Sequence, residues 1–571
     1  MPSNRILIKS SNGGWLSFSG ATSVLRADSP AQIGEVLKQI DKACNEGFFV
    51  AGFISYEAAV GIDDHYSNHT LKTLPYAWVG IYRQFSAVDD IFAGTAPADR
   101  LDWRPSISRS DYDSAISRIK SYIMAGDTYQ VNYTIKFLAK FAGNPFSLFR
   151  SMHDAQPSIY SSYIETDDFA IISVSPELFF EKKGNHLLSR PMKGTAKRGL
   201  YLEADNKAIE NLRNSEKNRA ENVMIVDMIR NDLGRIAEKG TVQVTSSFDV
   251  ERHPTVLQMT STVEAESCAG VGDIMRAMFP CSSITGAPKV RTMQIIKELE
   301  LQPRGIYTGA IGYVAPGGDA RFSVAIRTVS IDKASGSAEY GTGGGVVWDS
   351  IDESEYQECV SKALVLNTPA QDFALIETLL WRKDTGYFLL KEHAERMANS
   401  SVYFSYPFDE KMFHHVTSQE IASFTCDMRV RVILDRNGRI TSESRPMPQT
   451  RPMKVALSDT PVHSENVFLY HKTTNRSAYA EALKEGYDDV LLYNERGELT
   501  ESTIANIVLE IDGKKLTPCR DSGLLNGVYR RHLLEKNEIT EAVIRIEDLE
   551  RAQKVWLINS VRGWIEVHIA K

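Results

Sequence analysis

The chain has 571 residues, of which 24% are charged and 43% are hydrophobic, a composition typical of a globular protein with two or more domains. The formal net charge of −8 argues against a general nucleic-acid binder, because clustered lysine and arginine side chains hold a phosphate backbone. The first residues lack a signal-peptide pattern, and no apolar run approaches the roughly 20 residues that a membrane span needs. We therefore expect a cytoplasmic protein that binds neither nucleic acid nor membrane.

Strand-like and helix-like segments alternate irregularly along the first half of the chain. Residues 48–61 are rich in β-branched and aromatic side chains, as strands are. Residues 110–127 have helical periodicity with a capping residue and a final glycine, and residues 208–230 predict one longer helix. Residues 321–331 and 337–349 predict two further strands, and a glycine run lies in the second of them.

A linker near residues 364–372 divides the sequence into two predicted domains, residues 1–365 and 366–571. The segment LNTPAQDF, which contains a proline and several polar residues, is the basis for this linker. A predicted helix over residues 354–366 ends the first domain, and a new strand pattern opens the second at residues 373–382.

The segment DSIDESEYQECVSKA places Glu355, Glu358 and Lys362 on one face of the predicted helix. Two interpretations are open: a solvated charged stripe, or a magnesium site with a cation beside it for a substrate carboxylate. Mg²⁺ takes oxygen ligands, often one or two carboxylates together with water and substrate oxygens. Glu221, in the predicted helix over residues 208–230, is the candidate carboxylate from another element.

The glycine run in GTGGGVVWDS is not a phosphate-binding P-loop, because no G-K-[ST] sequence follows it. It is either a flexible turn or a place where backbone N–H groups approach an anionic ligand closely. Arg327 interrupts an apolar strand pattern nearby. Its charge therefore points either into a site or at a buried partner.

Taken together, these segments resemble the chorismate-utilising enzymes over nearly all of residues 1–365. The matching motifs include SPELFF, RPMKGT, AENVMIVDMIRNDLGR, RHPTVLQMTSTV, SSITGAPKVRTMQII, FSVAIRT and GTGGGVVWDS. The resemblance implies a large two-sheet α+β fold with a central site for chorismate. It implies Mg²⁺ ligation by Glu221 and Glu358, with Glu355 close by either as a further ligand or as a group that supports the ligands. It also implies a catalytic position for His253 at the ring end. Substrate-binding groups are implied at Thr195, Tyr307, Arg327, Gly343, Gly344, Gly345 and Lys362. Asn218 departs from the acidic residue of many relatives.

Lys193, in RPMKGT, separates activities within this family. A small residue here is typical of anthranilate synthases, which aminate C2 of the ring, whereas lysine is typical of aminodeoxychorismate synthases, which aminate C4. A neutral lysine that attacks C2 expels the C4 hydroxyl as the double bonds migrate, and ammonia then attacks C4 and expels the lysine. The amine must first lose its proton, and Lys197 and Arg198 are the neighbouring cations that could lower its pKa. The alternative is that Lys193 is an exposed bystander.

The amination needs a nitrogen donor, and we expect it to come from a separate protein. Glutamine amidotransferases of the relevant class use a cysteine in a G-x-C-x-G turn, and none of the six cysteines has that context. The resemblance therefore implies a separate glutaminase subunit that delivers ammonia. The cysteines also form no C-x-x-C pair and have no zinc-ligand spacing, which agrees with a reducing compartment.

Lys472, in LYHKTTNR, would by itself be a solvated loop residue. Its context is FALIETLLWR and HAERM before it, and GELTEST and SGLLNGVYRRHLLE after it. This order resembles the class IV pyridoxal-phosphate-dependent aminotransferases over essentially all of residues 372–571. The resemblance implies two α/β subdomains with pyridoxal 5'-phosphate in the cleft between them. Members of this family commonly form a homodimer through this domain, and the sequence leaves the oligomeric state open.

The implied roles of the second site follow from what the cofactor needs. Lys472 would bond to it covalently and later move protons, and Glu501 would pair with the pyridinium nitrogen. Its phosphate would contact Arg396 and the helix N-terminus at Gly527 and Val528. Ser502, Thr503 and Asn506 are expected to line the same side. Without the cofactor, Glu501 would be a strand-edge carboxylate and Arg396 a helix-surface residue.

The two resemblances together imply a bifunctional route from chorismate and ammonia to 4-aminobenzoate, through amination at C4 and elimination of pyruvate. The second domain's own residues do not separate lyase from transaminase chemistry, but the product of the first domain is the substrate of the lyase. One alternative is an anthranilate- or isochorismate-type synthase fused to an amino-acid aminotransferase, and Lys193 argues against it. Another is a catalytically silent scaffold, which the intact Glu221, Glu358, Lys472 and Glu501 argue against.

Overall fold

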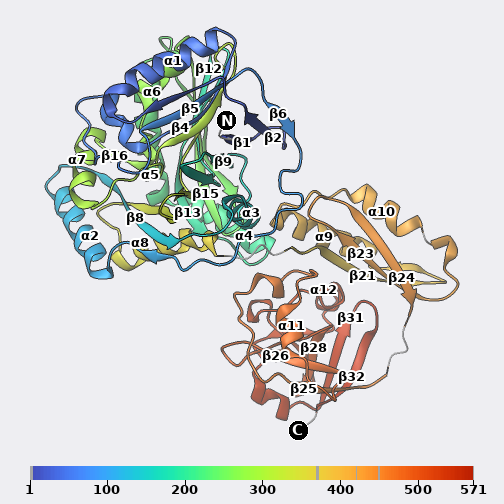
Figure 1. The fold of residues 1–571 in the computed structure, drawn as a ribbon. Helices are drawn as coiled ribbons and strands as arrows, with labels where there is room; N and C mark the ends of the chain where they lie inside the picture. Colours follow the sequence, from blue (N-terminus) through green and yellow to red (C-terminus); the bar gives the residue numbers. More distant parts are fainter. Residues whose placement is uncertain (1–3, 368–371, 420, 448–450, 570–571) are drawn as a thin grey trace. The chain divides into compact units, whose positions relative to one another are not determined.

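The protein is described by a computed structural model that covers residues 4–367, 372–419, 421–447 and 451–569. It divides into two compact units, coloured along the chain in Figure 1. Unit 1 comprises Met1–Ala196 and Glu210–Ala370, and unit 2 comprises Lys197–Ile209 and Gln371–Lys571. The predicted linker falls partly outside the described residues, and its first part, Leu364–Leu366, is the 3-10 helix η4.

Two large sheets form the centre of unit 1, and each contains ten strands within the described residues. The first sheet contains, in spatial order, β16 (Gly286–Ala287), β8 (Gln130–Lys140), β20 (Ser337–Val346), β19 (Thr328–Asp332), β10 (Phe169–Ser173), β9 (Ser162–Glu165), β1 (Arg5–Lys9), β2 (Trp15–Ser19) and β6 (Ser86–Val88), with β7 (Arg104–Pro105) beside β8. The second contains β13 (Met192–Lys197), β15 (Val256–Glu266), β12 (His186–Arg190), β11 (Leu178–Lys183), β18 (Ala320–Val324), β17 (Ala310–Val314), β4 (Phe49–Ile54), β5 (Ala77–Tyr82) and β3 (Ser23–Ala27), with β14 (Gln243–Arg252) beside β15.

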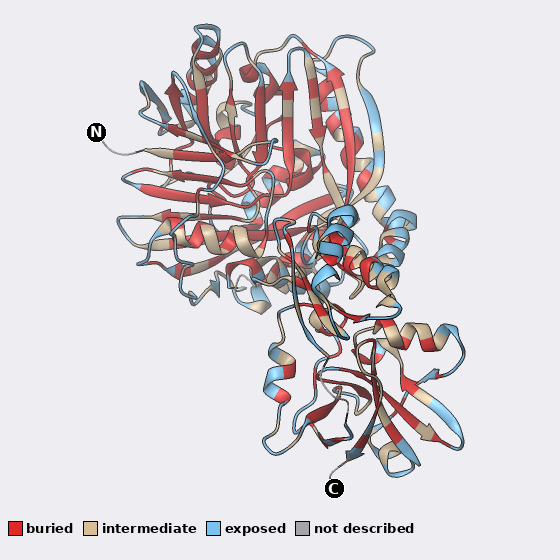
Figure 2. Cartoon of the chain, turned by 90° about the vertical axis from the view of Figure 1, so that its right-hand side faces the viewer, coloured by how far each residue is buried: buried red, intermediate tan, exposed pale blue. Residues whose placement is uncertain are grey.

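Helices cover the outer faces of both sheets. Those of unit 1 are α1 (Ile33–Asn45), α2 (Arg109–Met124), α3 (Pro145–Ala155), α4 (Leu202–Asn214, shared with unit 2), α5 (Glu216–Gly234), α6 (Val271–Met278), α7 (Lys289–Leu299) and α8 (Asp352–Ala363). Short 3-10 helices are η1 (Pro30–Gln32), η2 (Tyr56–Gly61) and η3 (Ser282–Ile284). Figure 2 shows that buried residues concentrate in the strands.

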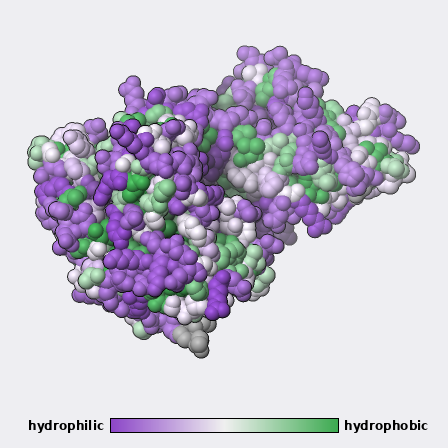
Figure 3. Space-filling model, turned by 90° about the horizontal axis from the view of Figure 1, so that it is seen from above, coloured by the Kyte–Doolittle hydropathy of each residue, from purple (hydrophilic) through white to green (hydrophobic). Residues whose placement is uncertain are grey.

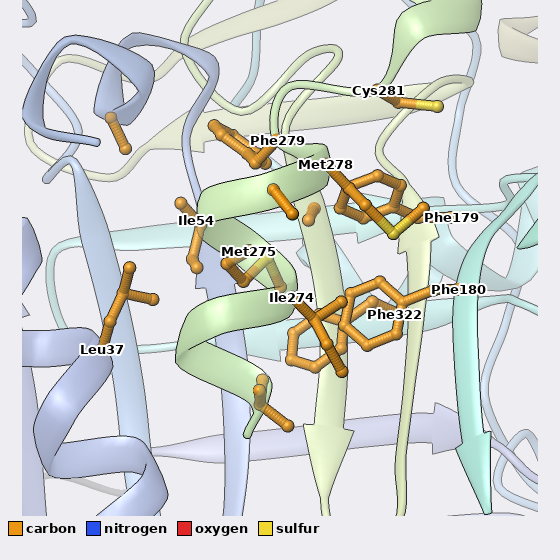
Figure 4. Packing of buried hydrophobic residues seen from close by; sticks show 14 of the residues in the cluster. Leu37, Ile54, Phe179, Phe180, Ile274, Met275, Met278, Phe279, Cys281 and Phe322 are labelled. Carbon is orange, nitrogen blue, oxygen red and sulfur yellow. The ribbon is translucent and has the colours of Figure 1, made fainter. Parts of the chain in front are cut away.

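The layered arrangement follows from strands that are apolar on both faces. In β4, Phe53 packs between the two sheets, whereas its neighbour Ile54 packs against the helices α1, α5 and α6. Figure 4 shows Met275 and Ile274 of α6 lying among side chains of the second sheet. This confirms the two-sheet α+β arrangement that the sequence predicts for the first half.

Two predicted elements differ from the structure. The single helix predicted over residues 208–230 is two helices, α4 and α5, because Ser215 caps α5 by accepting a hydrogen bond from the Asn218 amide. The strand predicted over residues 321–331 is also interrupted, and Arg327 lies in the connection between β18 and β19 with a positive φ of 49°.

Unit 2 contains a small subdomain and a larger one. In the small one, a sheet of β22 (Gly386–Phe388), β21 (Leu375–Arg382), β23 (Met428–Leu434) and β24 (Ile440–Pro446) packs against α9 (Leu390–Phe404) and α10 (Glu410–Gln419). The larger sheet contains β27 (Leu499–Ser502), β26 (Asp489–Tyr493), β25 (Met453–Leu457), β32 (Gly563–Ile569), β31 (Lys554–Asn559), β28 (Asn506–Ile511), β29 (Lys514–Pro518) and β30 (Thr540–Ala542). A further pairing of β27 with β28 closes part of this sheet into a ring around an apolar core.

The remaining helices of unit 2 are short. They are α11 (Ser477–Ala482), α12 (Val528–Glu535), η5 (Ile421–Ser423), η6 (Val467–Leu469), η7 (Arg520–Ser522) and η8 (Ile546–Glu550). No helix in the described part of the chain combines the length and apolar content needed to cross a membrane. On the face shown in Figure 3, hydrophobic residues form separate groups among hydrophilic ones.

Candidate active sites

A cavity of about 410 Å³ opens in unit 1 where β13, α5, β20 and α8 present polar side chains. The predicted residues that line it are Lys193, Thr195, Glu221, Tyr307, Arg327, Gly343, Gly344, Gly345, Glu355, Glu358 and Lys362. His253 is not among the lining residues, and its Nε2 instead lies 3.8 Å from Glu251 Oε2. The structure therefore brings together all of the predicted first-site residues except His253.

The glycine run is part of β20 and not a flexible turn. A Cβ at Gly344 would lie 2.8 Å from Glu355 Oε2, and a Cβ at Gly345 would overlap the Lys193 amine. Distances this short do not occur for real Cβ atoms, so a side chain at either position would displace the Glu355 carboxylate or the Lys193 amine, whereas at Gly343 a Cβ would meet the Tyr133 carbonyl oxygen at 2.3 Å. The run therefore lets the lysine and the carboxylates reach the backbone of β20.

Lys193 lies near two carboxyl groups. Its Nζ is 3.9 Å from Glu221 Oε2, and the exposed fractions of the two side chains are 14% and 19%. Glu177 also lines the cavity, is 3% exposed, and accepts a hydrogen bond of 2.6 Å from the Ser283 hydroxyl. Burial raises the pKa of Glu177 to about 7, although the positive charge of Lys193 acts in the opposite direction. A group that exchanges a proton near neutral pH therefore lies in the same cavity as the lysine.

Glu177 is not among the residues predicted from the sequence, although its segment contains a signal. The residue is the one carboxyl in SPELFF, where the other residues are apolar or small. A charged residue inside such a run is either paired or functional when it is buried.

The two cations expected beside Lys193 do not line the cavity. Lys197 and Arg198 both belong to unit 2. Lys197 makes an exposed ion pair of 2.7 Å with Glu465, and Arg198 makes a buried one of 2.7 Å with Asp205. The structure therefore does not support the expected influence of these two cations on Lys193.

The carboxylates predicted to bind magnesium are held by neighbouring groups. Glu355 accepts a hydrogen bond of 2.6 Å from Ser350, and Glu358 lies 2.6 Å from Lys362 Nζ. The charge of Lys362 lowers the pKa of Glu358, whereas burial raises the pKa of Glu355. Within the described residues, no group of three His, Cys, Asp or Glu side chains is arranged to hold a metal ion. Magnesium needs only one or two protein carboxylates, and Glu355 and Glu358, both near Gly344, fit that requirement.

Arg327 offers the cavity an unpaired donor. Its Nη1 atom is buried and has no hydrogen-bond partner among the described residues, and burial lowers the pKa of its guanidinium. A buried guanidinium with a free N–H binds carboxylates strongly, because the alternative is an unsatisfied charge. The position is also strained, since a positive φ is unfavourable for a residue with a side chain.

A second cavity, of about 270 Å³, lies in unit 2 between the small subdomain and the large one. All eight residues predicted for the second site line it: Arg396, Lys472, Glu501, Ser502, Thr503, Asn506, Gly527 and Val528. Three further cations line it that were not predicted from the sequence, Arg429, Arg476 and Arg562, although Arg476 ends the quoted segment LYHKTTNR. The cavity therefore has room and positive charge for an anionic ligand.

Lys472 and Glu501 have pKa values suited to proton transfer. Burial, and then the nearby Arg396, lower the pKa of Lys472 to about 8. Burial raises the pKa of Glu501 to about 7. Glu501 accepts hydrogen bonds of 2.8 Å from the Tyr479 hydroxyl and 3.1 Å from the Asn506 amide, which fix its carboxylate.

Arg396 is oriented by Glu377, which the sequence analysis missed. The guanidinium donates to both Glu377 oxygens, at 2.7 Å from Nε and 2.6 Å from Nη2. His393 Nδ1 lies 2.6 Å from the same carboxylate, which is 1% exposed. Although burial opposes it, the attraction of Arg396 and His393 lowers the pKa of Glu377 to about 2.

The donor set of this cavity fits pyridoxal phosphate. It combines a lysine amine of lowered pKa, a buried carboxylate for the ring nitrogen, and an arginine with a helix N-terminus for the phosphate. Gly527 is the N-cap of α12, and a Cβ there would overlap the Asn506 side-chain oxygen. A side chain at this position would therefore displace the Asn506 amide, which donates a hydrogen bond to Glu501.

Glu377→Gln is expected to lower the free energy of unfolding of unit 2 by about 3–5 kcal/mol, because the change leaves the Arg396 charge partly buried without its partner. Thermal unfolding of the full-length chain measures the effect. Glu392→Gln, on the same helix α9, is the matched control and should change the free energy by less than about 0.5 kcal/mol. Equal melting profiles for the two variants would show that the buried pair contributes nothing.

Comparison with known proteins gives two family matches in chain order. The model of the chorismate binding enzymes matches residues 92–368, and that of the class IV aminotransferases matches residues 374–570. Aminodeoxychorismate synthase component 1 of Escherichia coli is 38% identical over 319 residues, which are 54% of this chain and 69% of that protein. The chain belongs to the chorismate binding enzymes. It continues into a class IV aminotransferase domain.

Two further relatives show how far this likeness extends. Aminodeoxychorismate synthase component 1 of Bacillus subtilis is 42% identical over 257 residues, which are 45% of this chain and 54% of that protein. The crystal structure of anthranilate synthase component I from Streptococcus pneumoniae has a TM-score of 0.52 and 26% identity, covering 64% of this chain and 92% of that one. The chain thus spans little more than half the length of the first relatives it matches. The fold predicted for each half of this chorismate binding enzyme is confirmed.

Proposed function

We propose that the chain makes 4-aminobenzoate in two steps, amination of chorismate at C4 followed by elimination of pyruvate. The single observation that carries the proposal is the place of the Lys193 amine, in a cavity beside Glu177, Glu221 and the glycines of β20. The order of the two family matches supports the second step, because a class IV domain follows directly.

In the first site, Glu177 takes a proton from Lys193, and the neutral amine attacks C2 of chorismate. The ring double bonds migrate toward C4, and the C4 hydroxyl leaves with the electrons of its C–O bond. Ammonia then attacks C4, the double bonds shift back, and the C2–N bond to Lys193 breaks. Arg327 and the backbone of β20 would bind the carboxylates of chorismate. Glu355 and Glu358 would hold Mg²⁺, which neutralises a substrate carboxylate when bound.

In the second site, Lys472 would hold the cofactor and move the proton from C4 of the aminated ring. Pyridoxal phosphate, when bound, supplies a sink for the electrons of that C–H bond. Glu501 would fix the ring nitrogen, and Arg396 and the start of α12 would bind the phosphate. Loss of the ether oxygen from C3 then releases pyruvate and leaves an aromatic ring.

The nitrogen donor is proposed to be a separate glutaminase subunit. The relatives are named component 1, which is the name of one part of an assembly. Purified chain should therefore use ammonium ions, and turnover with glutamine alone would contradict this part of the proposal.

Product identification tests the whole proposal. The full chain is incubated with chorismate, magnesium, ammonium ions and pyridoxal phosphate, and the products are separated and identified by mass. 4-Aminobenzoate with one equivalent of pyruvate supports the proposal. Anthranilate would favour the activity of the Streptococcus pneumoniae relative instead, and would overturn C4 amination.

Glu177→Gln is expected to slow C4 amination by roughly 10²–10⁴-fold at neutral pH, the usual contribution of a positioned base. The ionised carboxylate is the form that takes the proton, so the parent rate should rise as pH rises through about 7. The variant should lose this rise. Rates of chorismate consumption from pH 5.5 to 8.5 test it, with Glu181→Gln on β11 as the control. A variant that keeps the parent pH profile would exclude Glu177 as the base.

A further inference from the structure

Unit 2 contains a segment that the family match assigns to the other half of the chain. Residues 197–209 lie inside the chorismate-binding match, yet they pack with Gln371–Lys571. The chain enters this segment from β13, only four residues after Lys193, and continues into the first turns of α4. We call residues 197–209 the crossing segment.

Arg198 fixes the start of the crossing segment. Its Nε donates to Asp205 Oδ1 at 2.7 Å, and the two side chains are 7% and 0% exposed. Its Nη2 donates to the Tyr403 carbonyl oxygen at 2.9 Å, and its guanidinium lies 4.2 Å from the centre of that ring. The Tyr403 hydroxyl donates in return to the Gly199 carbonyl oxygen at 2.7 Å. The buried ion pair orders the segment internally, and the contacts of Arg198 and Gly199 with Tyr403 hold the segment on α9.

Leu200 joins the crossing segment to the residue before Lys472. His471 Nε2 lies 3.2 Å from the Leu200 carbonyl oxygen, and His471 Nδ1 lies 2.9 Å from the Ser400 hydroxyl. Because a carbonyl oxygen only accepts, Nε2 carries the hydrogen and Nδ1 accepts from Ser400. Burial lowers the pKa of His471 to about 3, so the ring stays neutral and keeps this arrangement.

Tyr201 adds a second attachment. Its ring centre lies 5.6 Å from that of Tyr470, and its hydroxyl donates to Asp521 at 3.0 Å. Leu200 and Tyr201 also pack against the apolar cluster that contains Tyr479, whose hydroxyl bonds Glu501. The crossing segment therefore contacts the residue before Lys472 and packs against the cluster that holds a hydrogen-bond donor to Glu501.

The crossing segment also lies next to the expected phosphate site. It does not line the second cavity of unit 2, which we call the cofactor cavity. A small cavity of about 40 Å³ is lined by Leu202 and Glu203 together with Arg396 and Val528. Arg396 and Val528 line the cofactor cavity as well, whereas no residue of the crossing segment does. The segment therefore borders Arg396 and Val528, which line the cofactor cavity, and does not line that cavity itself.

We propose that the crossing segment positions Lys472, so that the second active site is incomplete without residues that lie within the first family match. The role of Lys472 in this statement rests on the proposed function, whereas the contacts of the segment do not. The segment holds the run Tyr470–Lys472 through His471, and it holds α9, which carries Arg396, through Arg198.

Amide hydrogen exchange in the cofactor-free, full-length chain tests the placement directly. Arg198→Ala should speed exchange of residues 467–474 by about tenfold or more and leave β28 unchanged, because the support of this run is lost. Lys197→Ala removes only an exposed ion pair and is the matched control. If Arg198→Ala does not fold, Tyr201→Ala gives the same readout without leaving a buried charge. Parent-like exchange at residues 467–474 overturns the proposal.

Kinetics of the second step provide the test of positioning. With 4-amino-4-deoxychorismate supplied directly, Tyr201→Ala should lower kcat by about tenfold at an unchanged KM, because the segment does not line the cavity. A raised KM with the parent kcat would contradict positioning. If the parent itself does not convert this compound, the proposed function fails, and the exchange measurement still decides the placement.

Discussion

Lys193→Ala is expected to reduce C4 amination of chorismate by roughly 10³-fold or more, because the variant lacks the nucleophile that divides a difficult substitution into two easier steps. The glycines of β20 support this expectation, because they leave room for the Lys193 side chain beside the strand. A Cβ at Gly345 would overlap the Lys193 amine, so the backbone of β20 leaves the space that this side chain occupies. Formation of 4-amino-4-deoxychorismate from chorismate and ammonium ions is measured by mass.

The control for this variant is a lysine on the same strand that points elsewhere. Lys197→Ala should aminate at the parent rate, since Lys197 pairs with Glu465 and does not line the cavity. Chorismate binding should survive in Lys193→Ala, because Arg327 and Lys362 remain in place. A variant that still aminates C4 at the parent rate would show that Lys193 is not the nucleophile. Formation of anthranilate would instead show that Lys193 directs the nitrogen to C4.

The sequence predicts the site residues well where several of them share a motif. RPMKGT, GTGGGVVWDS and EYQECVSKA each place a reactive or anion-binding residue at a fixed spacing, and the structure collects residues from all three at one cavity. The same holds for Lys472 and Glu501 in the second cavity. Such residues are recognisable because the order of motifs fixes their place in the fold before any contact is known.

The residues that the sequence analysis missed make their important contacts over long distances in the chain. Glu377 looks like one polar residue in a strand until it meets Arg396 and His393 on α9. Arg198, which was expected to act on Lys193, instead bonds Tyr403 across 205 positions, and no local sequence pattern indicates that pair. The helix break at Ser215 is a different case, because a serine followed by a helical run is a capping signal. There the apolar periodicity on both sides concealed the boundary.

Lys472→Ala is expected to abolish covalent attachment of pyridoxal phosphate and to stop formation of 4-aminobenzoate, while the first step continues. 4-Amino-4-deoxychorismate should then accumulate without pyruvate. Reduction with borohydride followed by mass measurement tests attachment, since the parent should gain a phosphopyridoxyl group and the variant should not. Lys391→Ala, an exposed lysine on α9, is the matched control. Release of pyruvate by Lys472→Ala at the parent rate would remove this lysine from the mechanism.

The rate of cofactor attachment should also report the environment of Lys472. Only the neutral amine attacks an aldehyde, so attachment to the cofactor-free parent should speed up as pH rises and level off above about 8. At neutral pH the neutral fraction is roughly 300-fold larger than for an amine with the ordinary pKa of 10.5. Burial in unit 2 is the main cause, with the nearby Arg396 adding to it. A rate that keeps rising beyond pH 10 would mean that solvent reaches the Lys472 amine and that its pKa is not lowered. Lys472 would then be protonated at neutral pH, and the proposed chemistry of the second cavity would lack its neutral amine.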